Sequence, residues 1–195
     1  MSPLPGALEE QDVAAKDMRR TRWRFFAIAG LIVLFDQITK AAVRGWLVRG
    51  ESWPAEEPLL GVYRFTHVHN TGMAFGLGQG RSAVFLAIAI LVVVLLSVWQ
   101  WRLPAQERWL RIALAMQVGG AVGNAIDRVH QGHVTDFFDF LVFPVFNIAD
   151  SAISIGVVLL AWQLWRVESA ASAEQEPSES GNVSPDTGAP PAASP

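Results

Sequence analysis

Four carboxylates lie close together in sequence, in a part of the chain that is otherwise mostly apolar or rich in glycine. The stretch between residues 119 and 156 contains Asp127, Asp136, Asp139 and Asp150. The apolar runs on either side are long enough to enter a bilayer. A carboxylate near hydrocarbon costs several kcal/mol unless it is paired, neutralised or facing water, so acids in such places are candidates for catalysis or ion transport.

The acids belong to two segments that should meet at one end of a helix pair. Asp150 lies at the start of the last apolar run, whereas Asp136 and Asp139 lie in the loop before it, which must fold back over the same end. Two carboxylates within reach of each other share a proton, so that one acts as general base and the other as general acid. This pairing suits amide hydrolysis by an activated water, with no nucleophilic side chain, metal or cofactor.

Other polar residues have a structural interpretation from their spacing alone. Asp36 and Lys40 are four apart on one helix face, which favours a structural ion pair at depth. Asn147 is a plausible N-cap, and Asp150 occupies the carboxylate position of a capping box. We expect Asp127 to stay ionised in a salt bridge with the adjacent Arg128.

The composition is typical of a membrane protein. The 195 residues are 51% hydrophobic and only 17% charged, with a mean hydropathy of +0.29. The net charge of -3 comes with no basic stripe, so nucleic-acid binding is not expected. The absence of cysteine excludes disulfides, thiol catalysis and thiolate metal sites.

The hydropathy pattern predicts a mainly α-helical membrane protein, a bundle of four transmembrane helices. The spans are expected at about 24–47, 83–101, 109–127 and 147–166, within a domain covering 23–166. A small extracytoplasmic β-rich cradle at about 50–75 should lie on the membrane surface. The flanks 1–22 and 167–195 are expected to be disordered cytoplasmic tails.

The distribution of basic residues predicts which side each loop lies on. Nine of the fifteen Lys and Arg residues fall on the side that holds both termini and the loop around Pro104, which favours a cytoplasmic location for that side. Within the third span, Gly119 and Gly123 form a small-xxx-small spacing that lets another helix approach closely.

Five sequence blocks, in this order, resemble lipoprotein signal peptidase, also called signal peptidase II. They are DQITK at 36–40, NTGMAF at 70–75, GGAVGNAIDR at 119–128, GHVTDF at 132–137 and FNIADS at 146–151. The resemblance extends from about residue 23 to residue 166. It implies a membrane aspartyl endopeptidase of the bacterial inner membrane that removes signal peptides from prolipoproteins, cutting before the diacylglyceryl-modified cysteine.

The resemblance also implies roles for single residues. Asp136 and Asp150 match the catalytic pair, and the resemblance separates Asp136 from the nearby Asp139. In the family, a shell of polar residues positions the substrate and the acids, and a further charged pair supports them. The residues that match this shell are Asn70, Asn124, Asp127, Arg128 and Asn147, and those that match the supporting pair are Asp36 and Lys40. The implied partners are lipid-modified prolipoproteins and membrane lipids. We expect a monomer without cofactor or metal, with its active site at the periplasmic boundary of the membrane.

Three other interpretations remain open at this point. Histidines at 67 and 69, and at 130 and 133, could hold a metal, although the chain has no HExxH string. A transporter or proton channel would also place acids within spans, but these acids cluster at one boundary and do not run through the bilayer. A membrane scaffold would explain the glycines but not the external carboxylates.

Overall fold

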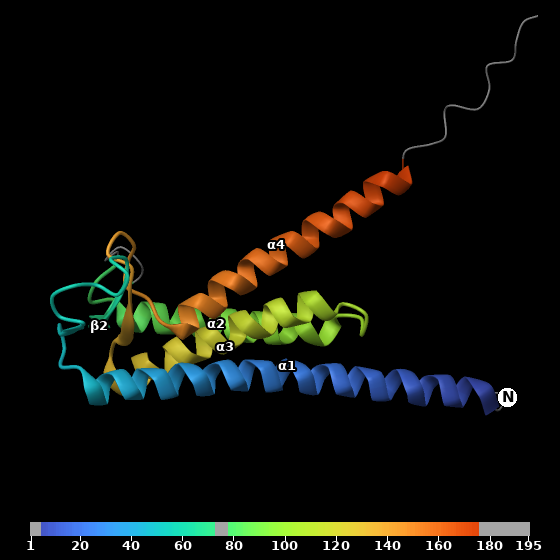
Figure 1. Cartoon of the computed structure of the whole chain (residues 1–195). Coiled ribbons are helices and arrows are strands. Elements are labelled where there is room, and N and C mark those ends of the chain that lie inside the picture. The colour runs from blue at the N-terminus through green and yellow to red at the C-terminus, as the bar shows by residue number, and fades with distance from the viewer. Residues whose placement is uncertain (1–4, 73–77, 176–195) are drawn as a thin grey trace, which may run out of the picture. The chain divides into compact units, whose positions relative to one another are not determined.

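The computed structural model describes residues 5–72 and 78–175, and Figure 1 shows the arrangement. The elements in chain order are α1 (Pro5–Trp46), β1 (Ser52–Trp53), β2 (Arg64–Asn70), α2 (Ser82–Arg102), α3 (Arg108–Gln131), β3 (Val134–Asp139) and α4 (Ile148–Gln175). The chain divides into two compact units, 1–163 and 164–195, and the described part of the second unit is the helical end of α4.

Within residues 5–72 and 78–175, three helices are long and apolar enough to cross a membrane. These candidate spans are Asp12–Trp46, Ser82–Arg102 and Ile148–Ser169. The protein is therefore mainly helical with membrane-spanning segments, as the hydropathy pattern predicts. The third predicted span, at 109–127, falls in α3, which is not among these helices in the described residues.

The composition of α3 reflects its central place in the bundle. It packs against α1 and α2, and its buried residues include Gly119, Gly120, Gly123, Asn124 and Asp127. Because so much of its surface faces protein, α3 needs fewer large apolar residues than a helix exposed to lipid. The predicted close approach at Gly119 is confirmed, since a Cβ there would lie 2.8 Å from the backbone oxygen of Ala29 in α1.

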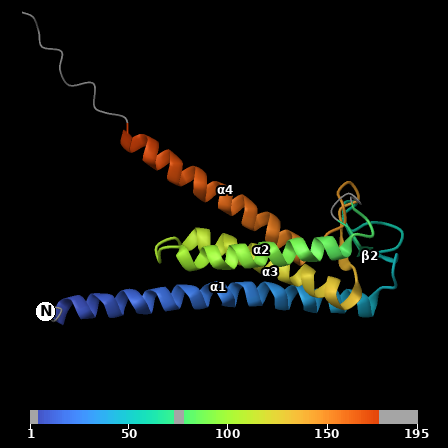
Figure 2. The same ribbon diagram turned by 180° about the vertical axis from the view of Figure 1, so that it is seen from behind.

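A three-stranded antiparallel sheet stands at one end of the helices, in the order β1-β2-β3 (Figure 2). The sequence predicted strands only in the 50–75 segment, and the third strand comes instead from the loop between α3 and α4. In the register of β2 and β3, Val68 is opposite Asp136 and His69 is opposite Thr135. The sheet therefore holds one predicted catalytic carboxylate on a hydrogen-bonded strand.

An apolar cluster joins the sheet to the helices. Phe137 of β3, which is 2% exposed, packs with Val43 and Leu47 at the end of α1, and Ile148 at the start of α4 adds to the same cluster. Because Phe137 follows Asp136 directly, its burial fixes the position of the strand that carries this acid.

Both flanks contain more helix than the sequence predicted. Helix α1 begins at Pro5, where residues 1–22 were expected to be disordered, and α4 continues to Gln175, beyond the expected end at residue 166. The reason at the N-terminus is physical: residues 7–20 are rich in Ala, Glu, Lys and Arg and continue an existing helix, so no new nucleus is needed. Residues 176–195 lie outside the described part.

The packing of α3 against α4 gives a first prediction. A Cβ on Gly120 would meet the backbone oxygen of Ala149, so we expect Gly120→Ala to push α4 away and to lower stability by about 1–3 kcal/mol. The measurement is thermal unfolding of the purified protein in detergent. Gly30→Ala is the matched control, because nothing lies within 4 Å of its Cβ position. Equal unfolding temperatures for the two variants would contradict the prediction.

Candidate active site

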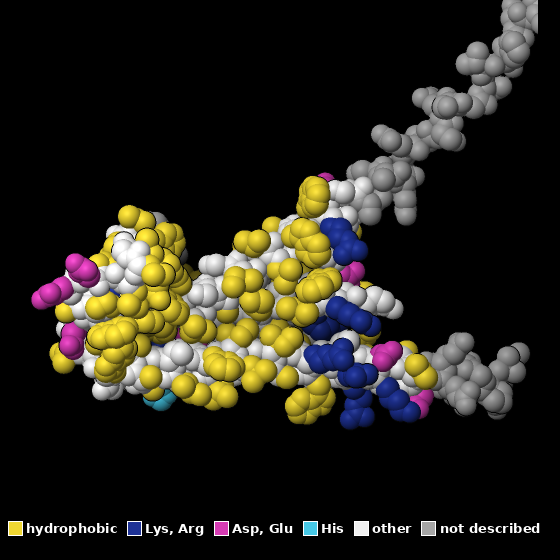
Figure 3. Space-filling model, viewed as in Figure 1, with side chains coloured by type: hydrophobic (Ala, Val, Ile, Leu, Met, Phe, Trp, Pro, Cys, Tyr) yellow, Lys and Arg dark blue, Asp and Glu magenta, His cyan; other side chains and the backbone are white. Residues whose placement is uncertain are grey.

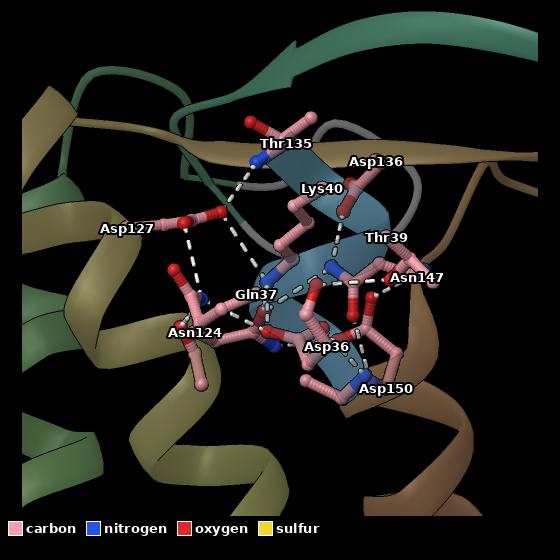
Figure 4. Close-up of polar contacts among 12 residues, drawn as sticks. Asp36, Gln37, Thr39, Lys40, Asn124, Asp127, Thr135, Asp136, Asn147 and Asp150 are labelled. Atoms are coloured by element: carbon pink, nitrogen blue, oxygen red, sulfur yellow. Dashed lines mark hydrogen bonds and ion pairs between the residues drawn. The ribbon is translucent and has the colours of Figure 1, made fainter. Parts of the chain in front are cut away.

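Polar side chains from α1, α3, β3 and the start of α4 converge beneath the sheet, as Figure 4 shows. The group contains the predicted residues Asp36, Lys40, Asn124, Asp127, Asp136, Asn147 and Asp150. Of these, Asp36, Lys40, Asp127 and Asn147 have no exposed surface at all. A buried polar cluster of this size is stable only when its members satisfy one another.

The two predicted catalytic carboxylates are linked through one residue, Asn147. The Nδ2 of Asn147 donates to Asp136 Oδ1 at 2.6 Å, and the backbone N–H of Asn147 donates to Asp150 Oδ2 at 3.2 Å. Each carboxylate has a second donor: Asn70 Nδ2 to Asp136 at 2.9 Å and Asn124 Nδ2 to Asp150 at 2.7 Å. All four carboxylate oxygens therefore accept from N–H groups of Asn70 in β2, Asn124 in α3 and Asn147.

The position of Asp150 follows from the local sequence. Asn147 and Asp150 form the predicted capping box, because the backbone N–H of Asp150 also donates to Asn147 Oδ1 at 3.0 Å. The capping interpretation and the catalytic interpretation were alternatives for Asp150 in the sequence. In the structure the same carboxylate makes the cap and lies next to Asp136, so the two roles are compatible.

Strand alternation separates Asp136 from Asp139. The two residues are three apart on β3, so their side chains point to opposite faces of the sheet. Asp139 accepts from Arg64 Nε at 2.9 Å and from Thr66 Oγ1 at 2.7 Å. Burial alone would raise the pKa of Asp139, but these hydrogen bonds outweigh it and lower the pKa below its usual value. Asp139 therefore belongs to the sheet and lies away from Asp150.

A buried cation lies at the centre of the cluster. Lys40 Nζ lies 2.8 Å from Asp36 Oδ2 and 3.3 Å from Asp127 Oδ2, and it also donates to Asn124 Oδ1 at 2.8 Å. The predicted Asp36–Lys40 pair is confirmed and is one part of a larger network. Through Asn124, which donates to Asp150, the ammonium group is one residue away from the acid pair.

The expected salt bridge between Asp127 and Arg128 is wrong. Asp127 instead contacts Lys40 and, at 3.6 Å, Arg44 NH1. Consecutive residues on a helix point in different directions, so the sequence neighbours cannot face each other. Arg128 instead donates to the backbone oxygens of Asn124 at 3.4 Å and Gly72 at 3.2 Å. Arg128 therefore connects α3 to the segment that follows Asn70 by a hydrogen bond.

Three residues of the network were not predicted from the sequence. Gln37 Nε2 donates to Asp36 and to the backbone of Gly123, and Arg44 NH1 donates to Thr135 Oγ1 at 3.1 Å. The backbone N–H of Thr135 donates to Asp127 Oδ2 at 3.0 Å. The helical period could have found Arg44, because it follows Lys40 by four residues on the same face of α1. Gln37 and Thr135 carry no comparable signal.

The surroundings of Asp136 favour its protonated form. Burial, followed by the nearby charge of Asp150, raises the pKa of Asp136 to about 7, although hydrogen bonds from Asn70 and Asn147 act in the opposite direction. A pair of acids with such a shift retains one proton near neutral pH. The site can therefore offer a proton donor and a proton acceptor together.

Three of the four histidines that suggested a metal are in contact with one another, and two of them belong to strand β2. The rings of His69 and His133 stack with centroids 3.7 Å apart, and His67 contacts His69 edge-on. Within the residues that the structure describes, no group of three or more His, Cys, Asp or Glu side chains is arranged to hold a metal ion. Burial, then the neighbouring His133, lowers the pKa of His69 to about 4.

Comparisons with known proteins agree with this geometry. Residues 28–166 match the family described as signal peptidase (SPase) II. The chain belongs to the signal peptidase II family. It is 40% identical over 140 residues to the lipoprotein signal peptidase of Moorella thermoacetica, covering 72% of this chain and 91% of that relative. It is 41% identical over 138 residues to the lipoprotein signal peptidase of Brevibacillus brevis, with coverages of 70% and 91%.

Solved structures of a bacterial membrane enzyme have the same fold as this signal peptidase II family member. One has a TM-score of 0.68 and 33% sequence identity, covering 79% of this chain and 93% of that structure. A second has a TM-score of 0.64, again with 33% identity, and the coverages are 72% and 92%. The family match begins at residue 28, so the first part of α1 precedes the region shared with the signal peptidase II family.

Proposed function

We propose that this protein is an aspartyl endopeptidase that removes signal peptides from prolipoproteins during lipoprotein maturation. The bond cut would be the one before the diacylglyceryl-modified cysteine. Membership of the signal peptidase II family supports the removal of signal peptides from prolipoproteins. The observation that supports the aspartyl mechanism is the pair Asp136 and Asp150. They come from separate elements, and both accept hydrogen bonds from Asn147, one from its side-chain amide and one from its backbone N–H.

In the proposed reaction, the carboxylate of the pair that has no proton takes one from a water molecule. The water attacks the scissile carbonyl while the protonated partner donates its proton to the developing oxyanion. The carboxyl that took the water proton then protonates the leaving nitrogen, and its partner regains a proton from the tetrahedral diol as the C–N bond breaks. Asn70, Asn124 and Asn147 hold the two acids at rest. When a signal peptide unwinds near hydrocarbon, its freed backbone groups need new partners, which these amides and Arg128 can provide.

The proposed location is the bacterial inner membrane, with a four-helix peptidase domain over residues 23–166. Helix α3 would be the fourth crossing: its 24 residues span about 36 Å, and its polar side chains turn toward other helices. Four crossings would leave both termini in the cytoplasm and the acid pair at the periplasmic boundary. The protein would act as a monomer, since both acids and their donors come from one chain.

The test is an assay of purified full-length protein in detergent with a chelator present. Two precursor peptides are compared that differ only in whether the cysteine carries a diacylglyceryl group, and mass spectrometry identifies the bond that is cut. Cleavage before the modified cysteine alone supports the proposal. A reaction abolished by the chelator would indicate a metal peptidase, and the absence of cleavage in both precursors would leave transport as the better interpretation of the acids.

The raised pKa of Asp136 predicts how activity depends on pH. Because burial and the charge of Asp150 raise this pKa to about 7, the proton shared by the pair is lost as the pH rises above that value. We therefore expect kcat/KM to fall by about tenfold for each pH unit well above 7, where the proton donor is missing. Initial rates between pH 5 and 9 measure this. A rate that increases up to pH 9 would contradict a shared proton.

A further inference from the structure

Basic side chains gather at the end of the bundle where the N-terminal half of α1 meets the turn between α2 and α3 (Figure 3). The exposed members are Lys16, Arg19, Arg20, Arg24, Arg102 and Arg108. This end is remote from the acid pair, since Arg22 and Asp36 are fourteen residues apart on one helix, a distance of about 21 Å. The preference for positive charge on the cytoplasmic side accounts for the exposed residues, which remain in water.

Two arginines at this end are not accounted for in that way, because they turn into the bundle. Arg111 is only 3% exposed. Arg22 is partly buried and precedes Phe25 by three residues, and Phe25 is a core residue that is 1% exposed. Residues three apart lie on the same helix face, so the Arg22 side chain extends the inward-facing ridge of α1.

The contacts of the two guanidinium groups leave part of each unsatisfied. Arg111 donates to the backbone oxygens of Gln100, Leu103 and Pro104 and to the side-chain Oε1 of Gln100, at 2.9 to 3.1 Å, which caps the end of α2. The Arg22 guanidinium lies over the ring of Trp101, 4.3 Å from its centroid. The Nε atoms of both arginines are buried without a hydrogen-bond partner.

The two guanidinium groups lie against neighbouring residues of α2, Trp101 and Gln100, and their positive charges repel each other. Among the side chains described, at residues 12–72 and 78–169, no carboxylate lies within ion-pair distance of Arg22 or Arg111. Like charges in a poorly solvated place are costly, and an anion bound by Arg22 would offset both charges.

The position along α1 indicates which anion is within reach. From Arg22 to Trp46 the helix is about 36 Å long, slightly more than the hydrocarbon thickness of a bilayer. Arg22 would then lie at the level of the lipid headgroups when Trp46 lies at the opposite surface. Trp23, Trp101 and Trp109 are half or more exposed at the same end, as interfacial aromatic residues are.

We propose that Arg22 forms a binding site for the phosphate of an anionic phospholipid between α1 and the α2–α3 turn, with the positive charge of the buried Arg111 behind it. The acyl chains would lie along the apolar faces of the helices. A zwitterionic lipid carries its own ammonium group and would be held less tightly, so the site selects for net negative charge. This inference depends only on the membrane location and not on the proposed peptidase reaction.

The experiment uses full-length protein in a nonionic detergent, equilibrated with equal amounts of phosphatidylglycerol and phosphatidylcholine. Native mass spectrometry counts the lipids that each protein molecule retains. We expect Arg22→Gln to lower the ratio of retained phosphatidylglycerol to phosphatidylcholine about fivefold, the effect of one basic group near an anionic lipid. Arg24→Gln is the matched control. Arg24 lies two residues after Arg22 and its side chain is exposed, so this change removes the same charge outside the site.

The outcomes separate a built site from general attraction. The site is supported if the lipid ratio changes less than twofold in Arg24→Gln and if Arg22→Lys keeps most of the ratio that Arg22→Gln loses. Equal losses for Arg22→Gln and Arg24→Gln, or no loss for either, would overturn it. Inorganic phosphate added at constant ionic strength distinguishes the source of the anion. If phosphate alone displaced the retained lipid, the site would bind a soluble anion and the assignment to a lipid would be wrong.

Discussion

Replacing Asp136 or Asp150 by asparagine should abolish cleavage, with a loss in kcat of about 10³- to 10⁴-fold for either variant. Each change removes a group that must hold or accept the shared proton. Because the two acids act as a unit, the double variant should be little worse than either single one. The measurement is single-turnover cleavage of a diacylglyceryl-modified precursor by purified protein in detergent.

The control for this prediction is Asp139→Asn on the same strand. Asp139 binds Arg64 and Thr66 on the other face of the sheet, so its loss should lower activity by no more than a few fold. If Asp139→Asn were as inactive as Asp136→Asn, the loss would reflect a damaged sheet, and the assignment of the acid pair would lose its support.

Stability gives a second readout that distinguishes a catalytic loss from a folding defect. The pKa of Asp136 is raised to about 7 by burial and by Asp150, so the folded state holds a proton that the unfolded chain releases above about pH 4. Stability therefore falls as the pH rises from about 4 to 7. Asp136→Asn removes the charge that causes this decrease, so at pH 8 its unfolding temperature should be no lower than that of the natural protein.

The sequence was most informative where a function depends on local spacing. The capping box of Asn147 and Asp150 and the ion pair of Asp36 and Lys40 each join residues three or four apart, so helical geometry alone predicts them. The glycine at 119 belongs to the same class, since its spacing with Gly123 indicates close helix packing before the partner helix is known.

What the sequence could not predict depends on contacts between distant segments. The strand that carries Asp136 pairs with β2, about 66 residues earlier in the chain, and its own residues show no regular alternation because nearly all of them are buried. Similarly, Asp127 lies next to Arg128 in sequence but contacts Lys40, from a helix 87 residues away. Tertiary packing brings such partners together, and the residues next to them in sequence do not indicate which distant residue they will contact.

Removing the buried cation should have the second large effect. Lys40→Met leaves Asp36 and Asp127 without the ammonium group that both contact, at 2.8 and 3.3 Å, and all three side chains are fully buried. Breaking one partner from a buried charge network typically costs about 3–5 kcal/mol. We therefore expect poor folding and no measurable cleavage. Thermal unfolding in detergent measures the first effect and the precursor assay the second.

A compensated variant can separate the structural role of Lys40 from its effect on the acid pair. In Asp36→Asn/Lys40→Met/Asp127→Asn the buried charges are removed together, so most of the lost stability should return. The charge of Lys40 lowers the pKa of Asp136, but this variant also removes two carboxylates, whose negative charges act in the opposite direction. We therefore expect the alkaline decline of kcat/KM to stay within about half a pH unit of its place in the natural protein. A restored fold without cleavage would show that Lys40 acts on the acid pair as well as on the fold.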